Sequence, residues 1–135
     1  MECQINVVSD VKNLGELLDG ARVEQVRFSP SGGCLQLHVD LIRSMIEQKK
    51  TVRRGLFRQV VTPWIKGHLH LTEIQELSVA RLRDTPTDSL PFLSCEAIVG
   101  GYAFQFNSPD GLQLMMSVKQ LGGHYADVGV PIESL

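Results

Sequence analysis

The sequence of 135 residues has few cysteines, few aromatic residues and no long apolar run. It contains no stretch of about 18 uncharged apolar residues, so we expect no membrane-spanning helix. Its start, MECQINVV, lacks a basic region followed by an apolar one, which predicts a cytoplasmic protein without a signal peptide. The three cysteines have no metal-ligand spacing, and we expect Cys34 and Cys95 to be buried, reduced thiols.

Motifs for common enzyme chemistry are also missing. The sequence contains no G-x-S-x-G, no P-loop and no G-x-G-x-x-G. Cys95 stands next to Glu96, but neighbouring residues of a strand point to opposite faces, so the two cannot act together as nucleophile and base. We therefore expect a protein that is not an enzyme and that needs no cofactor.

Three apolar-rich runs separated by turn residues occupy the region from Ser94 to Lys119. The runs are Cys95–Val99, Tyr102–Asn107 and Leu112–Val118, and clusters of Gly, Ser, Pro and Asp divide them. Apolar residues alternate along these runs, which is typical of strands with one buried face. The pattern predicts an antiparallel meander of three strands.

The same alternation predicts the core. An aromatic stripe such as Tyr102, Phe104 and Phe106 is more typical of a core than of a ligand cavity. The residues that we expect to be almost fully buried are Leu37, Phe104, Phe106, Leu112 and Leu114.

Other parts of the chain show apolar residues at helical spacing or in strand-like alternation. Ser9 and Asp10 precede apolar residues at helical spacing, which predicts a helix over about residues 10–18 with these two as N-caps. Two strands joined by a Ser-Pro-Ser-Gly-Gly turn are expected between residues 22 and 41. Further expected features are a strand from 67 to 81 with a bulge or corner near 73–75, a turn-rich loop at 84–91 and a last edge strand around 124–128.

Seven or eight short strands with hairpin connections and one short N-terminal helix predict a mainly β fold. We expect one domain over residues 1–135, built as an antiparallel β-sandwich or a flattened barrel. Helical patterns do not alternate with the strands, which argues against a doubly wound α/β fold.

Three segments, in order along the chain, resemble a known arrangement of strands and turns. They are VEQVRFSPSGGCLQLHVD, GHLHLTEIQELSV and AIVGGYAFQFNSPDGLQLMMSV, which lie within residues 22–41 and 67–118. They resemble several small bacterial β-sandwich families, some of which are classed as immunity proteins of toxin systems. The resemblance implies a sandwich fold and an immunity-like, protein-binding role, and it assigns no functional residue.

Residues 42–66 differ from the rest of the chain in charge. Seven basic residues face one acid, a balance of +6 that leaves -8 for the rest of a chain whose total is -2. Two interpretations are open: a solvated, mobile loop whose charges keep an edge strand soluble, or a surface that binds an acidic protein. The residues that we predict to contact a partner are Arg53, Arg54, Phe57, Arg58 and Trp64.

His68 and His70 form an H-x-H pattern in a predicted strand. Residues two apart on a strand share a face, so both imidazoles can approach one metal ion, and His38 or Glu73 can add a ligand. Two histidines on the polar face of a strand also occur by chance, and a zinc site needs at least three protein ligands. We therefore expect no metal and keep His68 and His70 as an alternative site.

These observations favour a small protein that works by binding another protein or by self-association. Nucleic acid is disfavoured as a partner, because the chain outside the basic segment is acidic. The alternative function is the binding of a metal ion or a small molecule at the strand that carries His68 and His70.

Overall fold

The computed structural model describes residues 1–82 and 90–133. Within these residues the chain forms ten strands, one α-helix and one 3-10 helix. In chain order they are β1 (Glu2–Gln4), α1 (Val8–Leu17), β2 (Arg22–Ser31), β3 (Cys34–Ser44), η1 (Ile46–Gln48), β4 (Lys50–Arg54), β5 (Phe57–Val61), β6 (Trp64–Arg81), β7 (Leu93–Ile98), β8 (Gly101–Asn107), β9 (Leu112–Val118) and β10 (Gly123–Ile132).

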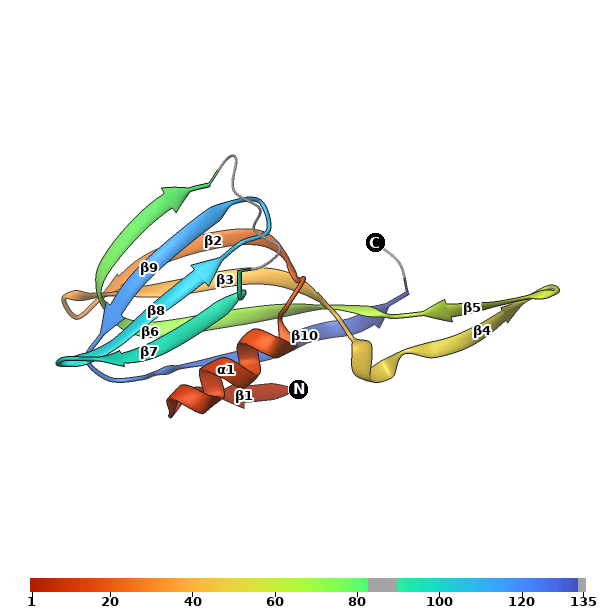
Figure 1. Cartoon of the computed structure of the whole chain (residues 1–135), viewed down its shortest axis with the longest axis horizontal. Helices are drawn as coiled ribbons and strands as arrows, with labels where there is room; N and C mark the ends of the chain where they lie inside the picture. Colours follow the sequence, from red (N-terminus) through yellow and green to blue (C-terminus); the bar gives the residue numbers. More distant parts are fainter. Residues whose placement is uncertain (83–89, 134–135) are drawn as a thin grey trace.

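The main sheet is built around β6, which is 18 residues long (Figure 1). The first half of β6 pairs with β3 along one edge and with β10 along the other. Its second half, from Ile74 to Arg81, pairs with β9. The sheet therefore runs from β1 through β10, β6, β9 and β8 to β7, while β3 and β2 extend it from the other edge of β6. All of these pairs are antiparallel.

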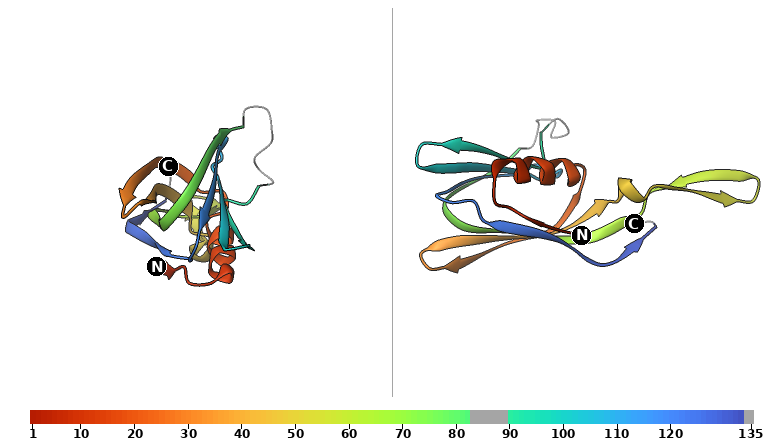
Figure 2. Two further views of the ribbon diagram at one scale, coloured as in Figure 1. Left: turned by 90° about the vertical axis from the view of Figure 1, so that its left-hand side faces the viewer. Right: turned by 90° about the horizontal axis from the view of Figure 1, so that it is seen from below.

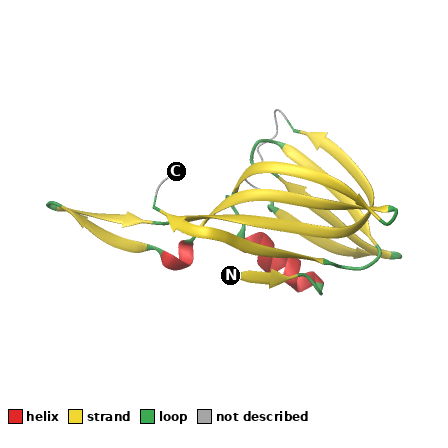
Figure 3. Cartoon of the chain, turned by 180° about the vertical axis from the view of Figure 1, so that it is seen from behind, coloured by secondary structure: helices red, strands yellow, loops and turns green. Residues whose placement is uncertain are grey.

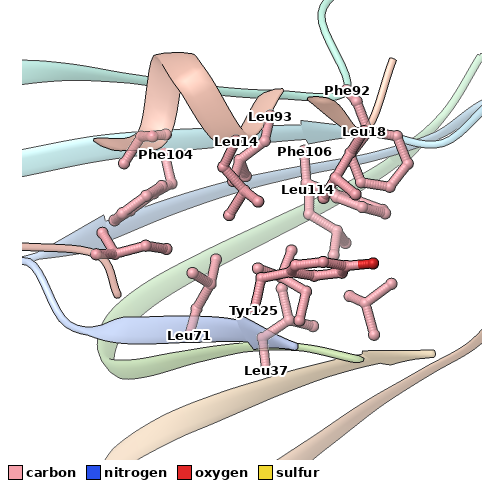
Figure 4. Packing of buried hydrophobic residues seen from close by; sticks show 14 of the residues in the cluster. Leu14, Leu18, Leu37, Leu71, Phe92, Leu93, Phe104, Phe106, Leu114 and Tyr125 are labelled. Atoms are coloured by element: carbon pink, nitrogen blue, oxygen red, sulfur yellow. The ribbon is translucent and has the colours of Figure 1, made fainter. Parts of the chain in front are cut away.

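The main sheet curls into a half-barrel whose inner surface encloses the core (Figure 2). One layer consists of β2, β3, the first half of β6 and β10, and the other consists of the second half of β6 with β9, β8 and β7. Figure 4 shows side chains of both layers meeting in the core, among them Tyr125 from β10 and Phe106 from β8. The predicted fold class, a flattened barrel or sandwich with one short helix, is confirmed.

The helix α1 packs beside β7 and buries Val11 and Leu14 against the sheet. Gly15 approaches β7 so closely that a Cβ atom would collide with the carbonyl oxygen of Leu93, which explains a glycine inside this helix. The predicted N-caps are wrong, because the helix begins at Val8. Asp10 lies in the first turn, and its carboxylate accepts hydrogen bonds from the backbone N–H groups of Asn6 and Val7 at 2.9 and 3.0 Å.

The strand β6 bends at Glu73, whose φ is 57°. It is the one non-glycine residue with a positive φ in the described ranges 1–82 and 90–133. The pairing register with β3 shifts just before Ile74, and the pairing register with β9 shifts just after it. This irregularity carries β6 from the first layer into the second. The break predicted near residues 73–75 is therefore confirmed.

A buried ion pair joins β3 to β10 across the start of β6. Arg43 is 1% exposed, and its Nε and Nη2 atoms donate hydrogen bonds to the two carboxylate oxygens of Asp127 at 3.0 and 2.9 Å. The hydroxyl of Tyr125 donates to the same carboxylate at 2.6 Å, and Nη2 of Arg43 also donates to Glu47 at 2.9 Å. Arg43 is therefore part of the core and not of an exposed basic surface.

Gly67 makes room for this network. It lies on β6 between β3 and β10, and the ring of Tyr125 occupies the position where a Cβ atom of residue 67 would lie. Any larger residue would displace Tyr125, which has 0% exposure, together with its hydrogen bond to Asp127.

The meander is confirmed as β7, β8 and β9. Three details differ from the sequence-based expectations. The tail strand β10 is not an edge, because β1 pairs with its outer side, and the sequence predicted no strand there. Leu112 is only half-buried, whereas Leu37, Phe104, Phe106 and Leu114 are buried as expected. Cys34 and Cys95 are free but half-buried, and the loop expected at 84–91 lies mostly outside the described residues.

The conformation of Glu73 leads to a test of the bend. Glu73→Gly should leave the free energy of unfolding unchanged or raise it, because glycine adopts a positive φ without steric cost. Glu73→Val should lower it by about 1–2 kcal/mol. The matched control, Glu76→Gly on the same strand, should lower it by about 0.5–1 kcal/mol. Chemical denaturation measures all three, and equal losses for both glycine variants would contradict the proposed strain.

The buried pair makes stability depend on pH. Burial alone would raise the pKa of Asp127, but hydrogen bonds from Arg43 and Tyr125 outweigh burial and hold that pKa below its usual range. A lowered pKa in the folded state adds stability above the unfolded pKa of about 4, and this stability is lost as the pH falls towards the folded pKa. Asp127→Asn should therefore cost about 3 kcal/mol at pH 7, because it leaves Arg43 buried without its charge partner.

The difference in unfolding free energy between wild type and Asp127→Asn should narrow below about pH 4. Glu133→Gln, which removes an exposed salt bridge to Lys50, is the control and should cost less than about 1 kcal/mol at any pH. Denaturation curves at several pH values provide the measurement. A loss for Asp127→Asn that is as small as that of the control would show that the pair is not a main support of the fold.

Candidate functional site

The basic segment folds into a separate hairpin, which we call the arm (Lys50–Val61, strands β4 and β5). Gly55 and Leu56 form its two-residue turn, and the two strands pair from Lys50 opposite Val61 to Arg54 opposite Phe57. At its base, the backbone N–H of Met45 donates to the carbonyl of Pro63 at 2.8 Å. Of the two open interpretations, a loop without secondary structure is therefore wrong for Lys50–Val61.

The arm projects away from the half-barrel (Figures 1 and 3). Among the described residues, β4 and β5 pair only with each other and form a sheet of their own. A salt bridge of 3.1 Å from Lys50 to Glu133 ties the base of the arm to the end of the chain. A two-stranded hairpin of about 17 Å has little stability by itself, and its outer backbone edges are free to pair with another chain.

Apolar side chains along the arm lie in solvent. Leu56 is 93% exposed, Phe57 is 78% exposed and Val60 is 55% exposed. Single exposed apolar residues are common on protein surfaces, but three of them gathered on one small hairpin are typical of a surface that another molecule covers.

Arginines are placed where they weaken the arm. Arg53 lies directly opposite Arg58, and like charges in this position destabilise a strand pair. Arg54 lies opposite Phe57. No salt bridge joins Arg53, Arg54 or Arg58 to an acid in the part of the chain that the structure describes, so their charges face solvent.

Four of the five residues predicted to contact a partner lie together on the arm: Arg53, Arg54, Phe57 and Arg58. Trp64 does not, because it begins β6 and is half-buried there, with the guanidinium of Arg22 at 5.7 Å from the centre of its ring. Lys66 pairs loosely with Glu24 on the sheet. The exposed basic cluster is therefore smaller than the segment 42–66 and is confined to Lys49–Arg58.

All four histidines of the chain meet on the outer surface of the first layer, which we call the histidine face. His38 on β3 lies opposite His70 on β6, and His70 lies opposite His124 on β10. His68 lies opposite Asp40. Leucines at the alternate positions point into the core, so the strand alternation turns the imidazoles outward.

Short contacts connect the rings. His38 and His70 are stacked, with centroids 4.4 Å apart and an interplanar angle of 11°. Nδ1 of His38 lies 3.4 Å from Nε2 of His68, and Nδ1 of His68 lies 2.8 Å from a carboxylate oxygen of Asp40. Nε2 of His70 lies 3.0 Å from the side-chain oxygen of Gln36.

Burial and electrostatics lower the pKa of two of these rings, His38 and His70. Burial and the neighbouring His68 lower the pKa of His38, and burial together with His38, His124 and His68 lowers the pKa of His70. The lowered pKa favours the neutral form of both rings at pH 7, in which one nitrogen carries a proton and the other can accept a hydrogen bond.

The sequence predicted His68 and His70 on one face and named His38 as an added ligand, and the structure brings these three together. Glu73 lies at the bend and is not part of the histidine face. His124 was missed as a site residue, because only the pairing of β10 with β6 places it beside His70. In the arrangement seen among the described residues, no three His, Cys, Asp or Glu side chains converge on one metal position.

A third surface feature is a shallow groove on the outside of the second layer, with a volume of about 520 Å³. Its lining includes Glu76, Glu96 and Met115 and contains no lysine or arginine. Cys95 borders it but points inward, and burial raises the pKa of its thiol to about 11. A thiol of this kind stays protonated at neutral pH, which disfavours nucleophilic chemistry.

The helices in the described residues are too short and too polar to cross a membrane. Comparison with family models, with curated proteins and with solved structures found no match to this chain. Its function must therefore be inferred from its own residues.

The opposed arginines allow the stability of the arm to be tested. Arg58→Glu would place a carboxylate opposite Arg53, which should stabilise the strand pair by about 0.2–1 kcal/mol and slow amide exchange in the arm by up to about fivefold. Gln59→Glu, opposite Val52, adds the same type of charge without a cation directly across and is the control. Hydrogen exchange of the whole chain measures both, and faster exchange in Arg58→Glu would contradict the repulsion.

Proposed function

We propose that this chain is a non-enzymatic protein-binding module that contacts its partner through the arm. The observation that carries the proposal is the composition of this projecting hairpin. Lys49, Lys50, Arg53, Arg54 and Arg58 give residues 49–61 a charge of +5 without any acid, which leaves -7 for the rest of a chain whose total is -2. Leu56 and Phe57 lie exposed among these cations.

Solubility alone does not account for this composition. Lysines and arginines on an edge strand prevent unwanted pairing, but exposed Leu56 and Phe57 promote it. Aromatic residues and arginines together are typical of the centres of protein interfaces, where a pocket on the partner covers the aromatic ring. A mixture of both kinds of residue at the tip of a hairpin therefore favours docking over mere solvation.

The chemistry of the arm defines the partner. It should be a protein with an acidic surface that offers an apolar recess for Phe57. A nucleic acid fits less well, because the arm has a single aromatic residue for base stacking and the remainder of the chain is acidic. The resemblance to small bacterial sandwich families that include immunity proteins agrees with a protein partner.

A second copy of the chain is the first partner to test. The groove beside Glu76 and Glu96 is acidic, includes the half-exposed Met115 in its lining and contains no lysine or arginine. Insertion of the arm of one copy into the groove of another would bring opposite charges together and would cover the apolar tip.

The test is a triple charge reversal, Arg53→Glu with Arg54→Glu and Arg58→Glu. The control is Lys12→Glu with Arg81→Glu and Lys119→Glu, which changes the net charge equally at exposed sites away from the arm. Sedimentation velocity of the pure protein measures self-association, and chemical cross-linking in source cells identifies proteins that contact Lys49 and Lys50. The arm triple should weaken binding at least about tenfold, the control should not, and both should melt near the wild-type temperature.

Salt provides a second readout of the same interaction. Attraction between exposed charges is screened over about 8 Å at physiological ionic strength, so the association rate should fall as salt is added. A chain that is monomeric at low salt and yields no cross-link to the arm would contradict the proposal. Equal effects of the arm triple and the control triple would contradict it as well.

A further inference from the structure

A chain of polar side chains on the histidine face links β2 and β3 to β6. The hydroxyl of Ser29 on β2 lies 3.3 Å from Nε2 of His38. Nδ1 of His38 lies 3.4 Å from Nε2 of His68, and Nδ1 of His68 lies 2.8 Å from the carboxylate of Asp40. The ring of His70 stacks on that of His38 at 4.4 Å. We propose that this array is an acid-sensitive lock, which holds the β2–β3 hairpin against β6 while its rings are neutral and loosens it when they are protonated.

The carboxylate of Asp40 fixes the direction of the hydrogen bonds in this chain. It can only accept, so Nδ1 of His68 carries a proton and Nε2 of the same ring is an acceptor. Nδ1 of His38 therefore donates to His68, and Nε2 of His38 accepts from the hydroxyl of Ser29. In this neutral state each ring nitrogen of the chain has a partner, and the bond between His38 and His68 crosses from β3 to β6.

The chain can hold one added proton without losing these bonds. A proton on Nε2 of His68 makes that ring a donor at both nitrogens. His38 then loses its proton from Nδ1 and takes one up at Nε2 by exchange with solvent, so that Nδ1 accepts from His68 and the hydroxyl of Ser29 accepts from Nε2. The rings stay bonded, and the added charge lies beside the carboxylate of Asp40.

A second proton breaks the array. If His38 is protonated as well, two N–H donors face each other across 3.4 Å, and two positive rings lie on adjacent strands. A proton on His70 has a similar effect, because its ring is stacked on His38 and lies 6.4 Å from that of His68. Like charges on neighbouring strands weaken a strand pair, so these protons act against the pairing of β3 with β6.

The other groups around the array do not offset a second proton. They are two loose cation–carboxylate pairs, one carboxylate on β1 and the fourth histidine: Arg27 with Asp40, Lys66 with Glu24, Glu2, and His124. Among the described residues, Asp40 is the one carboxylate within hydrogen-bond distance of a ring of the array, and Arg27 lies 3.8 Å from it. His124 meets the ring of His70 edge-on at 5.4 Å and adds no negative charge.

The direction of the pH effect follows from two of the rings. Burial, His68 and Arg27 lower the pKa of His38, and burial together with the three other histidines lowers the pKa of His70. The unfolded chain therefore takes up these protons near pH 6.5, before the folded chain does. The stability that the neutral array adds is fully present above about pH 6.5 and is lost as the pH falls below it. This window lies above the one in which Asp127 responds.

Hydrogen exchange of the whole chain at pH 7.5 and pH 5.5 tests the proposal, with protection factors corrected for the intrinsic rate at each pH. At the lower pH, the protection factors of amides between β3 and β6 should fall at least about fivefold. Those between β8 and β9, in the second layer, should fall less than about twofold. An equal fall in both layers would overturn the proposal, because it would indicate global unfolding and not the loosening of one hairpin.

Variants assign the effect to the rings. His38→Gln and His70→Gln should each at least about halve the fall between β3 and β6, and the double variant should abolish it. Lys66→Gln is the matched control, because it places the same side chain on the outer surface of β6 but removes no imidazole, and it should keep the full fall. Each variant is compared with itself at two pH values, so a general loss of stability does not affect the comparison. A full fall in the double variant would overturn the assignment.

Ring signals of the histidines in NMR spectra give a second readout. His38 and His70 should titrate below the ordinary histidine value of about 6.5. Titration of both rings above that value would overturn the proposal, because acid would then favour the folded state. The triple reversal of Arg53, Arg54 and Arg58 lies on the arm, in a separate sheet, so that variant should keep the response to acid.

Discussion

The pairing register of β6 is the constraint on which the rest of the structure depends. This strand hydrogen-bonds to β3, β10 and β9, so one register determines the faces of both layers. A slip of one residue would turn Leu69 and Leu71 into solvent and His68 and His70 into the core. The cost of exposing those leucines and burying those imidazoles secures the register. The outward direction of His68 and His70 is therefore a direct consequence of how the core is packed.

The buried pair of Arg43 and Asp127 acts at the same end of β6 as the arm. It joins β3 to β10 over Gly67, just before the chain leaves the half-barrel after Ser44, where β3 ends. A charge pair in this place stabilises less than an apolar core would, because both groups lose their hydration. Its geometry is nevertheless specific, since a bidentate guanidinium and a tyrosine hydroxyl saturate one carboxylate. The pair thus fixes β3 against β10 close to the base of the arm.

Alternation along the chain was enough to predict the strands of the meander, the long hairpin and the break at Glu73, because each of these features depends on neighbours in sequence. The position of β10 between β6 and β1 was not predictable in this way, because the apolar pattern of a strand does not determine which strands it pairs with. The same limit hid His124, whose role follows only from its place opposite His70. The sequence predicted the basic composition of the arm but not its hairpin shape, because exposed strands show no alternation of apolar and polar residues. The predicted charge of the segment also included Arg43, which is buried.

Two features of this chain break local rules for stability, the positive φ of Glu73 and the opposition of Arg53 and Arg58. The fold explains only the first of them. The positive φ of Glu73 has a structural explanation, because the bend of β6 between the two layers requires it. The opposition of Arg53 and Arg58 has no such explanation, since a threonine or glutamate in either place would pair better and the half-barrel does not contact them. The gathering of all four histidines on one face is likewise not needed by the core, which touches only the opposite side of these strands. The packing of the half-barrel therefore explains neither the opposed arginines nor the gathered histidines.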